Sequence, residues 1–486
     1  MPSQPLPPRL AAAVVFLASG SVLVLEIVGL RLVGPYVGVT LQTSSAVIGV
    51  ALAAIAYGAW TGGWLADRLD PRRLLGPALL LAGASTALTL PIVRYAGRLL
   101  QGTDPTSVLL LAVLALFVPA ALLSAVTPLV VKLQLADLAQ TGRVVGRLSG
   151  IGTLGAITAT FATGFLLVAA LRTTTIVVGL AALLAAAGIA IGWYAVRRPA
   201  SVPVLVVLAG SGLALVAPNP CDIETAYHCA SVTVDGQRPT GRYLWLNGAQ
   251  HSYVDTADPR HLEFAYAKWI GAVVDTMAPS GRAIDVLHIG GGGFTLPAYV
   301  EATRPGSDNL VLELDADLVD LARARLALRP GLRVVTGDAR VNLARQPAGG
   351  RDLVIGDAFG HLVVPWHLTT RELMADVRRV LRAGGVYAMN LIDRPGARLA
   401  RAEAATVSAV FPYVALVAPP GAVAGRELAN FVLLASDAPL PLDALRPRLA
   451  AMAEPVALVD GRAFAGGAAV LTDDFAPVDQ LLTGFP

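Results

Sequence analysis

Long apolar runs fill most of the first 217 residues of the chain. They cover residues 10–33, 43–66, 74–93, 106–131, 148–170 and 173–195, and a shorter run covers 203–217. Each of the first six is long enough to cross about 30 Å of hydrocarbon at about 1.5 Å per helical residue. The pattern predicts a multi-pass α-helical membrane domain of about seven helices, the last of which either spans the bilayer or is re-entrant.

The remaining residues show the pattern of an α/β domain. Short strands and turns between residues 224 and 254 predict a small β-hairpin layer. After a helix-like stretch at 262–277, strand-like runs follow at 284–289, 310–315, 333–338, 353–357 and 385–390. We therefore expect a transmembrane bundle at 1–217, a β-hairpin layer at 218–259 and a Rossmann-like domain at 260–486.

Composition agrees with this division. The chain is 55% hydrophobic and 15% charged, with a mean hydropathy of +0.64, which indicates residence in a membrane. Residues 1–217 hold 13 Lys and Arg and 5 Asp and Glu, whereas residues 218–486 hold 24 Lys and Arg and 29 Asp and Glu. A domain boundary is therefore expected near Pro218–Pro220. No basic stripe indicates nucleic-acid binding. None of the six histidines has metal-ligand spacing, so no metal site is expected.

The distribution of basic residues predicts the orientation in the membrane. With a cytoplasmic N-terminus, the inner segments carry nine Arg and Lys and the outer segments four. That asymmetry favours the inside N-terminus. An odd number of crossings then places the C-terminal domain outside the cytoplasm, and an even number returns it to the cytoplasm.

Two features near the bilayer leave alternatives open. Cys221 and Cys229 are the two cysteines of the chain, and they form either a disulfide, which would indicate an oxidising compartment, or two partly buried thiols. Glu26 is the one acid well inside an apolar run, with Arg31 five residues later. It belongs either to a functional polar site within the membrane or to a neutral or paired carboxyl beside an Arg31 that reaches the interface.

A glycine run follows the first strand of the α/β domain. Strand 284–289 leads directly into Gly290, Gly291, Gly292 and Gly293, and a helix is expected to follow. Strand, glycine turn and helix in this order form the first unit of nucleotide-binding folds, because the backbone must bend sharply and admit a ligand without a Cβ in the way.

Acidic residues end the next three strands. Glu313 lies about twenty residues beyond the glycines, where a carboxylate can accept ribose hydroxyls. Asp338 is placed to bond an adenine amino group, and Asp357 ends the fourth strand. Each acid alone would suit a helix N-cap, but their joint spacing predicts an adenosine site at the carboxyl edge of a parallel sheet.

These residues resemble the spermidine synthases, or polyamine aminopropyltransferases. The motifs that carry the resemblance are Glu224–Tyr227, Leu246–Gly248, Tyr266, the glycine turn, Glu313–Asp315, Gly337–Arg340 and Asp357. The whole chain resembles the bacterial membrane-fused spermidine synthase-like proteins, in which a Glu and an Arg in the first helix, a Gly-rich later helix and a closing Thr-Asp-Asp recur. Here those are Glu26, Arg31, Gly146–Gly155 and Thr472–Asp474.

The resemblance implies a class I methyltransferase-like or spermidine synthase-like transferase. Its donor substrate would be S-adenosylmethionine or decarboxylated S-adenosylmethionine, and its acceptor an amine or polyamine. The partners expected are therefore this small molecule and the lipid bilayer, with a homodimer as a further expectation. The residues implied are Gly290–Gly293, Glu313, Asp338 and Ala339 for the donor, Asp357 and Tyr266 for catalysis, and Gln250 and His251 for the acceptor.

The reactive half of the site departs from the family pattern. Gly293 and Phe294 stand where the family has Asp then Gly, and Gly360 stands where it has the second Asp of Asp-Ser-Ser-Asp. Ala267 and Lys268 replace the His-Glu that follows the tyrosine. Each lost carboxylate should weaken polyamine binding by about 1.5–3 kcal/mol. The alternative hypothesis is therefore a catalytically degenerate membrane protein that binds adenosyl compounds or polyamines, or that takes part in transport.

Overall fold

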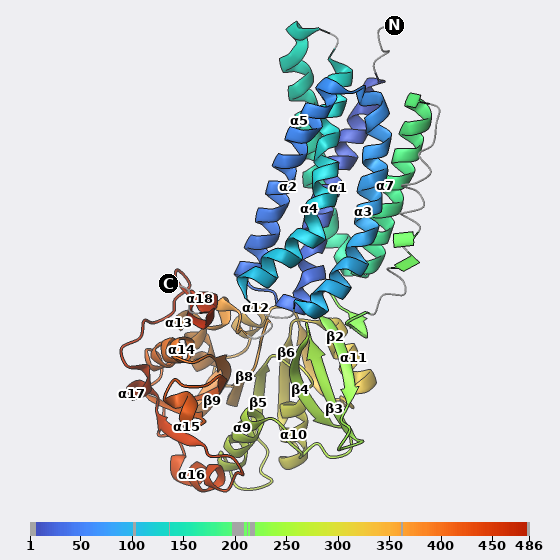
Figure 1. Cartoon of the computed structure of the whole chain (residues 1–486). Coiled ribbons are helices and arrows are strands. Elements are labelled where there is room, and N and C mark those ends of the chain that lie inside the picture. Colours follow the sequence, from blue (N-terminus) through green and yellow to red (C-terminus); the bar gives the residue numbers. More distant parts are fainter. Residues whose placement is uncertain are drawn as a thin grey trace. The chain divides into compact units, whose positions relative to one another are not determined.

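Long helices build the first part of the chain, and a mixed α/β fold builds the second (Figure 1). The structure, a computed structural model, describes residues 6–100, 104–135, 137–196, 209–210, 212–213, 219–360 and 363–483. It separates into two units, Met1–Cys229 and Ala230–Pro486. This architecture confirms the predicted fold class, a helical domain joined to a Rossmann-like domain.

Six helical stretches of the first unit are long and apolar enough to cross a membrane, as six of the runs predict. The predicted seventh run, at 203–217, lies outside the described residues except at 209–210 and 212–213. The elements are α1 (Pro8–Val37), α2 (Leu41–Arg68), α3 (Pro71–Leu99), α4 (Pro105–Gln134), η1 (Leu138–Gln140), α5 (Thr141–Ala162), the π-helical η2 (Thr163–Leu167), α6 (Val168–Ala170) and α7 (Thr173–Val196).

Glycines let these helices approach closely. A Cβ on Gly62 of α2 would lie 2.6 Å from the Cα of Ala125 on α4, and one on Gly155 of α5 would lie 2.4 Å from the carbonyl oxygen of Phe16 on α1. Close backbone approach gives the van der Waals contact that holds helices together in lipid. In the described part of the chain no atom lies within 4 Å of such a Cβ on Gly146 or Gly150 of α5, so these two glycines make no such close contact there.

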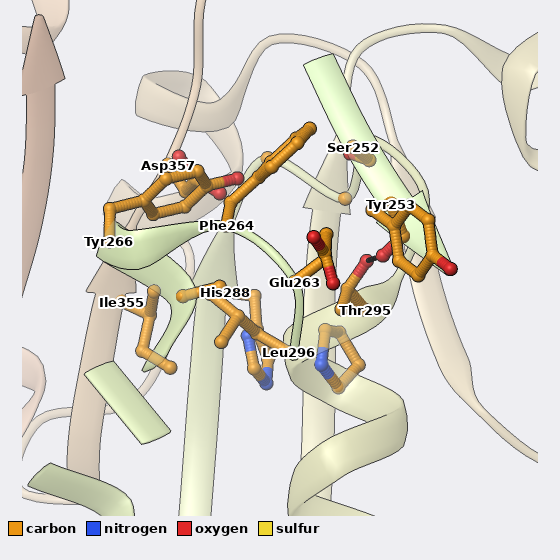
Figure 2. A pocket seen from close by; sticks show the side chains of 14 residues that line it. Ser252, Tyr253, Glu263, Phe264, Tyr266, His288, Thr295, Leu296, Ile355 and Asp357 are labelled. Atoms are coloured by element: carbon orange, nitrogen blue, oxygen red, sulfur yellow. Dashed lines mark hydrogen bonds between the residues drawn. The ribbon is translucent and has the colours of Figure 1, made fainter. Parts of the chain in front are cut away.

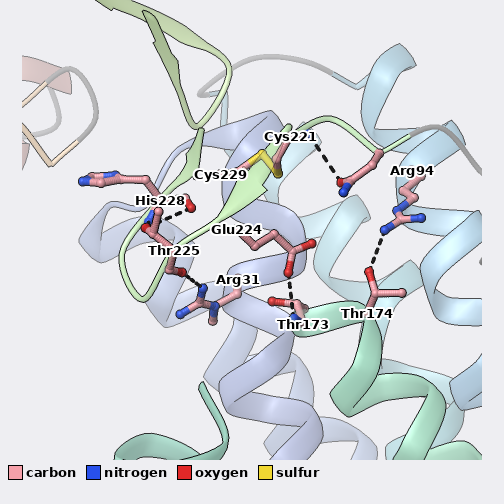
Figure 3. The surroundings of a disulfide bond; sticks show 10 residues. Arg31, Arg94, Thr173, Thr174, Cys221, Glu224, Thr225, His228 and Cys229 are labelled. Atoms are coloured by element: carbon pink, nitrogen blue, oxygen red, sulfur yellow. Dashed lines mark hydrogen bonds between the residues drawn. A yellow bond between two sulfur atoms is a disulfide. The ribbon is translucent and has the colours of Figure 1, made fainter. Parts of the chain in front are cut away.

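The segment 219–229 is fixed to the ends of two helices (Figure 3). Cys221 and Cys229 form a disulfide, which settles the alternative that the sequence leaves open. The Arg31 guanidinium, near the end of α1, donates to the carbonyl oxygens of Thr225 and, at 2.6 Å, Ala226. The carboxylate of Glu224 accepts a 2.7 Å hydrogen bond from the backbone N–H of Thr173, the first residue of α7. A carboxylate at this helix N-terminus is also favoured by the helix dipole.

Two sheets follow. The smaller has the order β1-β2-β3-β4, with β1 (Ile223–Glu224), β2 (Cys229–Val234), β3 (Gly241–Leu246) and β4 (Ala249–Asp255), and it forms the predicted hairpin layer. The larger has the order β12-β10-β11-β9-β8-β5-β6-β7. Its strands are β5 (Asp285–Ile289), β6 (Asp308–Glu313), β7 (Arg333–Thr336), β8 (Arg351–Gly356), β9 (Leu381–Asp393), β10 (Tyr413–Ala418), β11 (Ala429–Ser436) and β12 (Ala457–Asp460).

Strands β9, β8, β5, β6 and β7 are parallel, and β11 pairs antiparallel with β9. The carboxyl ends of β5, β6, β7 and β8 therefore lie along one edge of the sheet, where doubly wound folds bind ligands. The helices of this unit are α9 (Ala265–Thr276), α10 (Thr295–Thr303), α11 (Ala316–Arg325), α12 (Ala339–Ala344), η3 (Trp366–Leu368), α13 (Arg371–Val380), α14 (Arg398–Ser408), α15 (Pro420–Val423), α16 (Leu442–Ala450), α17 (Gly461–Ala465) and α18 (Val478–Thr483).

One carboxyl group is enclosed in the core of this unit. Glu403 of α14 is fully buried, and neither of its oxygens has a hydrogen-bond partner among the described residues. Burial raises the pKa of Glu403 well above its usual value of 4.5, because the charged form cannot be solvated there. The folded protein therefore holds Glu403 as a neutral acid, whereas the unfolded chain ionises it at neutral pH.

This difference predicts a pH-dependent stability. Because the folded-state pKa of Glu403 is raised, its contribution to the free energy of unfolding is fully present below pH 4.5. That contribution is lost as the pH rises toward the folded-state pKa. Each pH unit in that window should cost about 1.4 kcal/mol. We expect the thermal midpoint of the second unit to fall from pH 5 to pH 8, and to fall less in Glu403→Gln, which cannot ionise. Equal pH slopes in the two proteins would contradict this assignment.

Candidate active site

A cavity opens at the carboxyl edge of the large sheet, between the glycine turn, β4 and the start of α9 (Figure 2). About 420 Å³ of space, including open solvent at its mouth, lies between its walls. Its lining comprises Ser252, Tyr253, Glu263, Phe264, Tyr266, Ala267, His288, Gly290, Gly291, Thr295, Leu296, Pro297, Ile355 and Asp357. Three Phe and Tyr rings, the aliphatic side chains of Leu296, Pro297 and Ile355, and two carboxylates thus face one space, which suits a ligand with an apolar body and a cationic end.

The glycine turn passes very close to the end of β8. Gly290 has a φ of +93°, and a Cβ on it would lie 2.5 Å from the carbonyl oxygen of Asp357. Gly292 also has a positive φ, +50°. The turn therefore needs glycine at position 290 for two reasons, the backbone conformation and the space, which is what the sequence pattern predicts.

Two side chains hold the turn in place. The Glu313 carboxylate, at the end of β6, accepts hydrogen bonds from the backbone N–H groups of Gly291 at 2.7 Å and Gly292 at 3.3 Å, and from that of Asp315 at 3.0 Å. Ser252 of β4 accepts one from the N–H of Gly293 at 2.9 Å. An ionised carboxylate has about four lone-pair positions, so Glu313 keeps about one for a further donor.

Asp357 is the acid best placed to act on a ligand. It lines the cavity, and its Oδ1 accepts a 2.8 Å hydrogen bond from the Asn390 side chain. The Tyr266 hydroxyl also donates to its carboxylate. Burial raises the pKa of Asp357 to about 6, and the two hydrogen bonds partly offset this rise by stabilising the charged form.

Tyr266 and Asp357 act as a pair. In Figure 2 the phenol ring of Tyr266, from α9, lies beside the carboxylate of Asp357. Burial, followed by the nearby charge of Asp357, raises the pKa of Tyr266 well above 10. Tyr266 therefore stays protonated and serves as a hydrogen-bond donor rather than as a base.

Asp338 has different neighbours. Its carboxylate accepts from the N–H of Val341 at 3.0 Å, which caps α12, and its other oxygen lies 3.0 Å from Nε2 of His367. Asp338 and Ala339 do not line the cavity. The link to the site is through the backbone, because Gly337 donates its N–H to the carbonyl oxygen of Glu313 at 2.9 Å.

The predicted residues thus separate into groups. Tyr266, Gly290, Gly291 and Asp357 share the cavity, and Glu313 binds its glycine wall. Gly293 lines a second, neighbouring cavity together with Phe294. Gln250 is exposed on β4, and neither it nor His251 lines either of these two cavities.

Several lining residues have no motif that would single them out in the sequence. Glu263 and Phe264 enter the cavity from the segment before α9, and His288 from within β5. His288 is buried and bonds Asn309 at 3.0 Å, and burial lowers its pKa to about 4, so it is neutral. The sequence offers one signal for Glu263, an acid three residues before Tyr266. It offers none for His288, which occupies an ordinary position in a strand.

Among the described residues there is no group of three or more His, Cys, Asp or Glu that could hold a metal ion.

Comparison with known proteins gives sequence and structural relatives. No family model matches the chain. The chain is 32% identical over 130 residues to the polyamine aminopropyltransferase of Vibrio vulnificus, a match that covers 26% of this chain and 43% of that protein. The chain thus spans less than half the length of this curated relative.

Solved structures of similar proteins cover about half of the chain. A probable spermidine synthase from Corynebacterium glutamicum is 28% identical with a TM-score of 0.49, covering 52% of this chain and 96% of that one. The spermidine synthase from Thermotoga maritima is 17% identical with a TM-score of 0.34, covering 50% and 81%.

The parallel sheet, the glycine turn and the acid-ended strands define a Rossmann-like α/β domain of the nucleotide-binding class. The sequence match adds that part of this chain is similar to a polyamine aminopropyltransferase.

The turn geometry predicts an asymmetry between two glycines. Gly290→Ala places a Cβ 2.5 Å from a backbone oxygen at positive φ, so we expect a loss of roughly 2–4 kcal/mol in the free energy of unfolding. Gly360→Ala is the matched control, because the nearest atom that the described residues place beside its Cβ would be 3.8 Å away, and we expect a change within about 0.5 kcal/mol. Denaturant unfolding of both variants measures this, and equal stabilities would refute the packing described.

Proposed function

We propose that the protein is a transferase that uses S-adenosylmethionine or its decarboxylated form as donor and an amine or polyamine as acceptor, with aminopropyl transfer as the family-level reaction. One observation carries the proposal. A carboxylate with a pKa of about 6 lines a cavity whose glycine wall is held by a second, buried carboxylate at the neighbouring strand end.

The glycine wall and Glu313 fit an adenosyl group. Gly290 and Gly291 line the cavity without side chains, so the chain of a donor can lie against the backbone. Glu313, 5% exposed, keeps about one acceptor position beyond its three backbone bonds, enough for one ribose hydroxyl. We assign Asp338 to the adenine end, with His367 as the side chain that holds its carboxylate.

Asp357 and Tyr266 suit the acceptor end. A bound adenosyl sulfonium supplies a carbon that is already activated toward a nucleophile. At pH 7 most Asp357 side chains are ionised, because the pKa is about 6, and the carboxylate can bind a cationic amine and accept its proton. Tyr266 holds this carboxylate in place, and Phe264 and Tyr266 offer aromatic faces to a cation.

This role predicts both a pH profile and a mutational loss. Transfer should fall as the pH drops below about 6, because Asp357 becomes protonated there. Asp357→Asn should lower turnover by about 10²–10⁴-fold, the usual contribution of a positioned acid or base. A radiolabelled-donor assay with a panel of amines, run from pH 5 to 9, measures both effects. Wild-type turnover that is unchanged by Asp357→Asn would exclude Asp357 as the base.

We also propose that the second unit lies outside the cytoplasm. Lys132, late in α4, pairs with Asp67, late in α2, at 2.8 Å, and Gln134 donates to the carbonyl oxygen of Leu6 at 2.6 Å. These helix ends and the N-terminal segment therefore share one end of the bundle, and Arg68, Arg72 and Arg73 belong to it. The excess of basic residues favours the cytoplasmic side for that end.

The disulfide segment occupies the opposite end. It contacts Arg31 near the end of α1 and Thr173 at the start of α7. These two helix ends lie at the end of the bundle away from the excess of basic residues. A disulfide persists in an oxidising compartment, which agrees with the outer side. Ala230, the first residue of the second unit, follows Cys229 directly, so that unit continues from the outer end.

Cysteine labelling tests this orientation with little background, because the chain has two cysteines in all. We expect a membrane-impermeant thiol reagent to label intact cells after an impermeant reductant opens the disulfide, and not before. A Cys221→Ser, Cys229→Ser double variant is the control that should stay unlabelled. Labelling that requires permeabilised cells would place the segment in the cytoplasm instead.

A further inference from the structure

A chain of two side-chain amides continues behind Asp357. Asn390 donates from Nδ2 to Oδ1 of Asp357 at 2.8 Å, and Asn430 donates from Nδ2 to Oδ1 of Asn390 at 3.0 Å. Asn390 comes from β9 and Asn430 from β11, which pair antiparallel, with Asn430 opposite Ile392. The cavity carboxylate is thus connected to two further strands of the sheet.

Asn390 is buried and Asn430 partly buried, and the residues next to them in sequence are apolar. Met389, Leu391 and Phe431 are each at most 2% exposed, and Asn390 itself is 2% exposed. A buried amide costs free energy unless its donors and acceptors are bonded, so a purely structural position would favour a branched apolar residue. A buried amide at Asn390, bonded to Asp357 on one side and to Asn430 on the other, therefore calls for a role that an apolar residue could not fill.

We propose that Asn390 and Asn430 are positioning residues that fix which end of the Asn390 amide faces Asp357. The proposal rests on the function proposed above, in which Asp357 meets the acceptor.

The physical basis is the asymmetry of an amide group. Its NH₂ end stabilises an ionised carboxylate, whereas its carbonyl end repels one. Asn390 alone could present either end. The donor from Asn430 occupies the Asn390 oxygen and so commits the NH₂ end to Asp357. Asn430 thereby acts on Asp357 without touching it.

The other groups around Asp357 do not supply this control. Tyr266 from α9 donates to it, and Tyr253, Glu263 and His288 line the same cavity. His288 is neutral across the working range, since its pKa is about 4. Behind β8, the Tyr387 hydroxyl lies against Gly356, and the Glu403 carboxyl on α14 is held neutral by burial. Asn390 and Tyr266 are the side chains that hydrogen-bond the carboxylate of Asp357 among the described residues.

We call the hydrogen-bonded series Asn430, Asn390 and Asp357 the relay. Three variants of the full-length protein test it by a measurement that needs no turnover. The protonated Asp357 carboxyl gives an infrared C=O band, identified by its loss in Asp357→Asn, and its titration reports the protonation of that residue directly. In Asn390→Leu the donor is lost, so the midpoint should rise by about one to two pH units. Asn430→Ala, which frees the amide to turn, should give a smaller rise.

Asn430→Asp gives the most specific signature. It is nearly the same size as asparagine, but its carboxylate accepts rather than donates, so the Asn390 amide should turn and present its oxygen to Asp357. The midpoint should then rise at least as much as in Asn390→Leu. Asn342→Leu, which replaces another buried amide far along the chain on α12, is the matched control and should leave the midpoint in place.

The outcomes separate the relay from the proposed function. Midpoints that stay within about 0.3 pH units of wild type in both Asn430→Asp and Asn390→Leu would overturn the relay. If Asn390→Leu fails to fold, the Asn430→Asp result decides alone. If the midpoints shift in the variants but the wild-type protein transfers nothing to any amine, the relay would be supported and the proposed transferase function would be contradicted. Where transfer is measurable, the acid limb of the pH profile should move with the infrared midpoint.

Discussion

The site depends on how closely the backbone of the glycine turn approaches two strand ends. Gly290 meets the carbonyl of Asp357 with no room for a Cβ, and the N–H groups of Gly291 and Gly292 both donate to Glu313. This contact fixes the distance between the β6 and β8 ends, and with it the spacing of the two carboxylates. Glu313 is consequently as much a support of the turn as a candidate ligand for ribose. The cavity exists because these backbone contacts leave Gly290 and Gly291 bare on their other side.

Much of this was predictable, because each feature leaves a periodic or local signal. The six long apolar helices follow from long apolar runs, and the strands from short apolar runs that end in acids. Gly290 was predictable because positive φ and close approach both require glycine. That Asp357 and Tyr266 both belong to the site was implied by family resemblance rather than by spacing, since α9 and β8 are far apart in the chain.

What the sequence did not indicate depends on contacts between distant segments. Ser252 reaches Gly293 because β4 packs on the turn, whereas the neighbouring Gln250 and His251, expected to meet the acceptor, line neither cavity. β4 pairs with β3 through Ser252 and Gln250 but skips His251, and this irregularity breaks the simple alternation of faces that a sequence pattern assumes. Asn390 and Asn430 lie within apolar strands, and pattern alone cannot show that Asn390 reaches Asp357 and that Asn430 reaches Asn390. In the first unit, likewise, nothing in the spacing of Arg31 and Glu224 indicates that both would fix the disulfide segment to helix ends.

The central claim is that an adenosyl compound binds against Glu313 and the glycine turn. Calorimetric titration of the full-length protein with S-adenosylmethionine and with its decarboxylated form tests it most directly, with Glu313→Gln as the comparison. We expect at least one donor to bind wild type and to lose about tenfold or more in Glu313→Gln, because a charged acceptor and the support of the turn are removed together. No binding of either donor to the folded wild-type protein, or equal affinity in both proteins, would contradict the account.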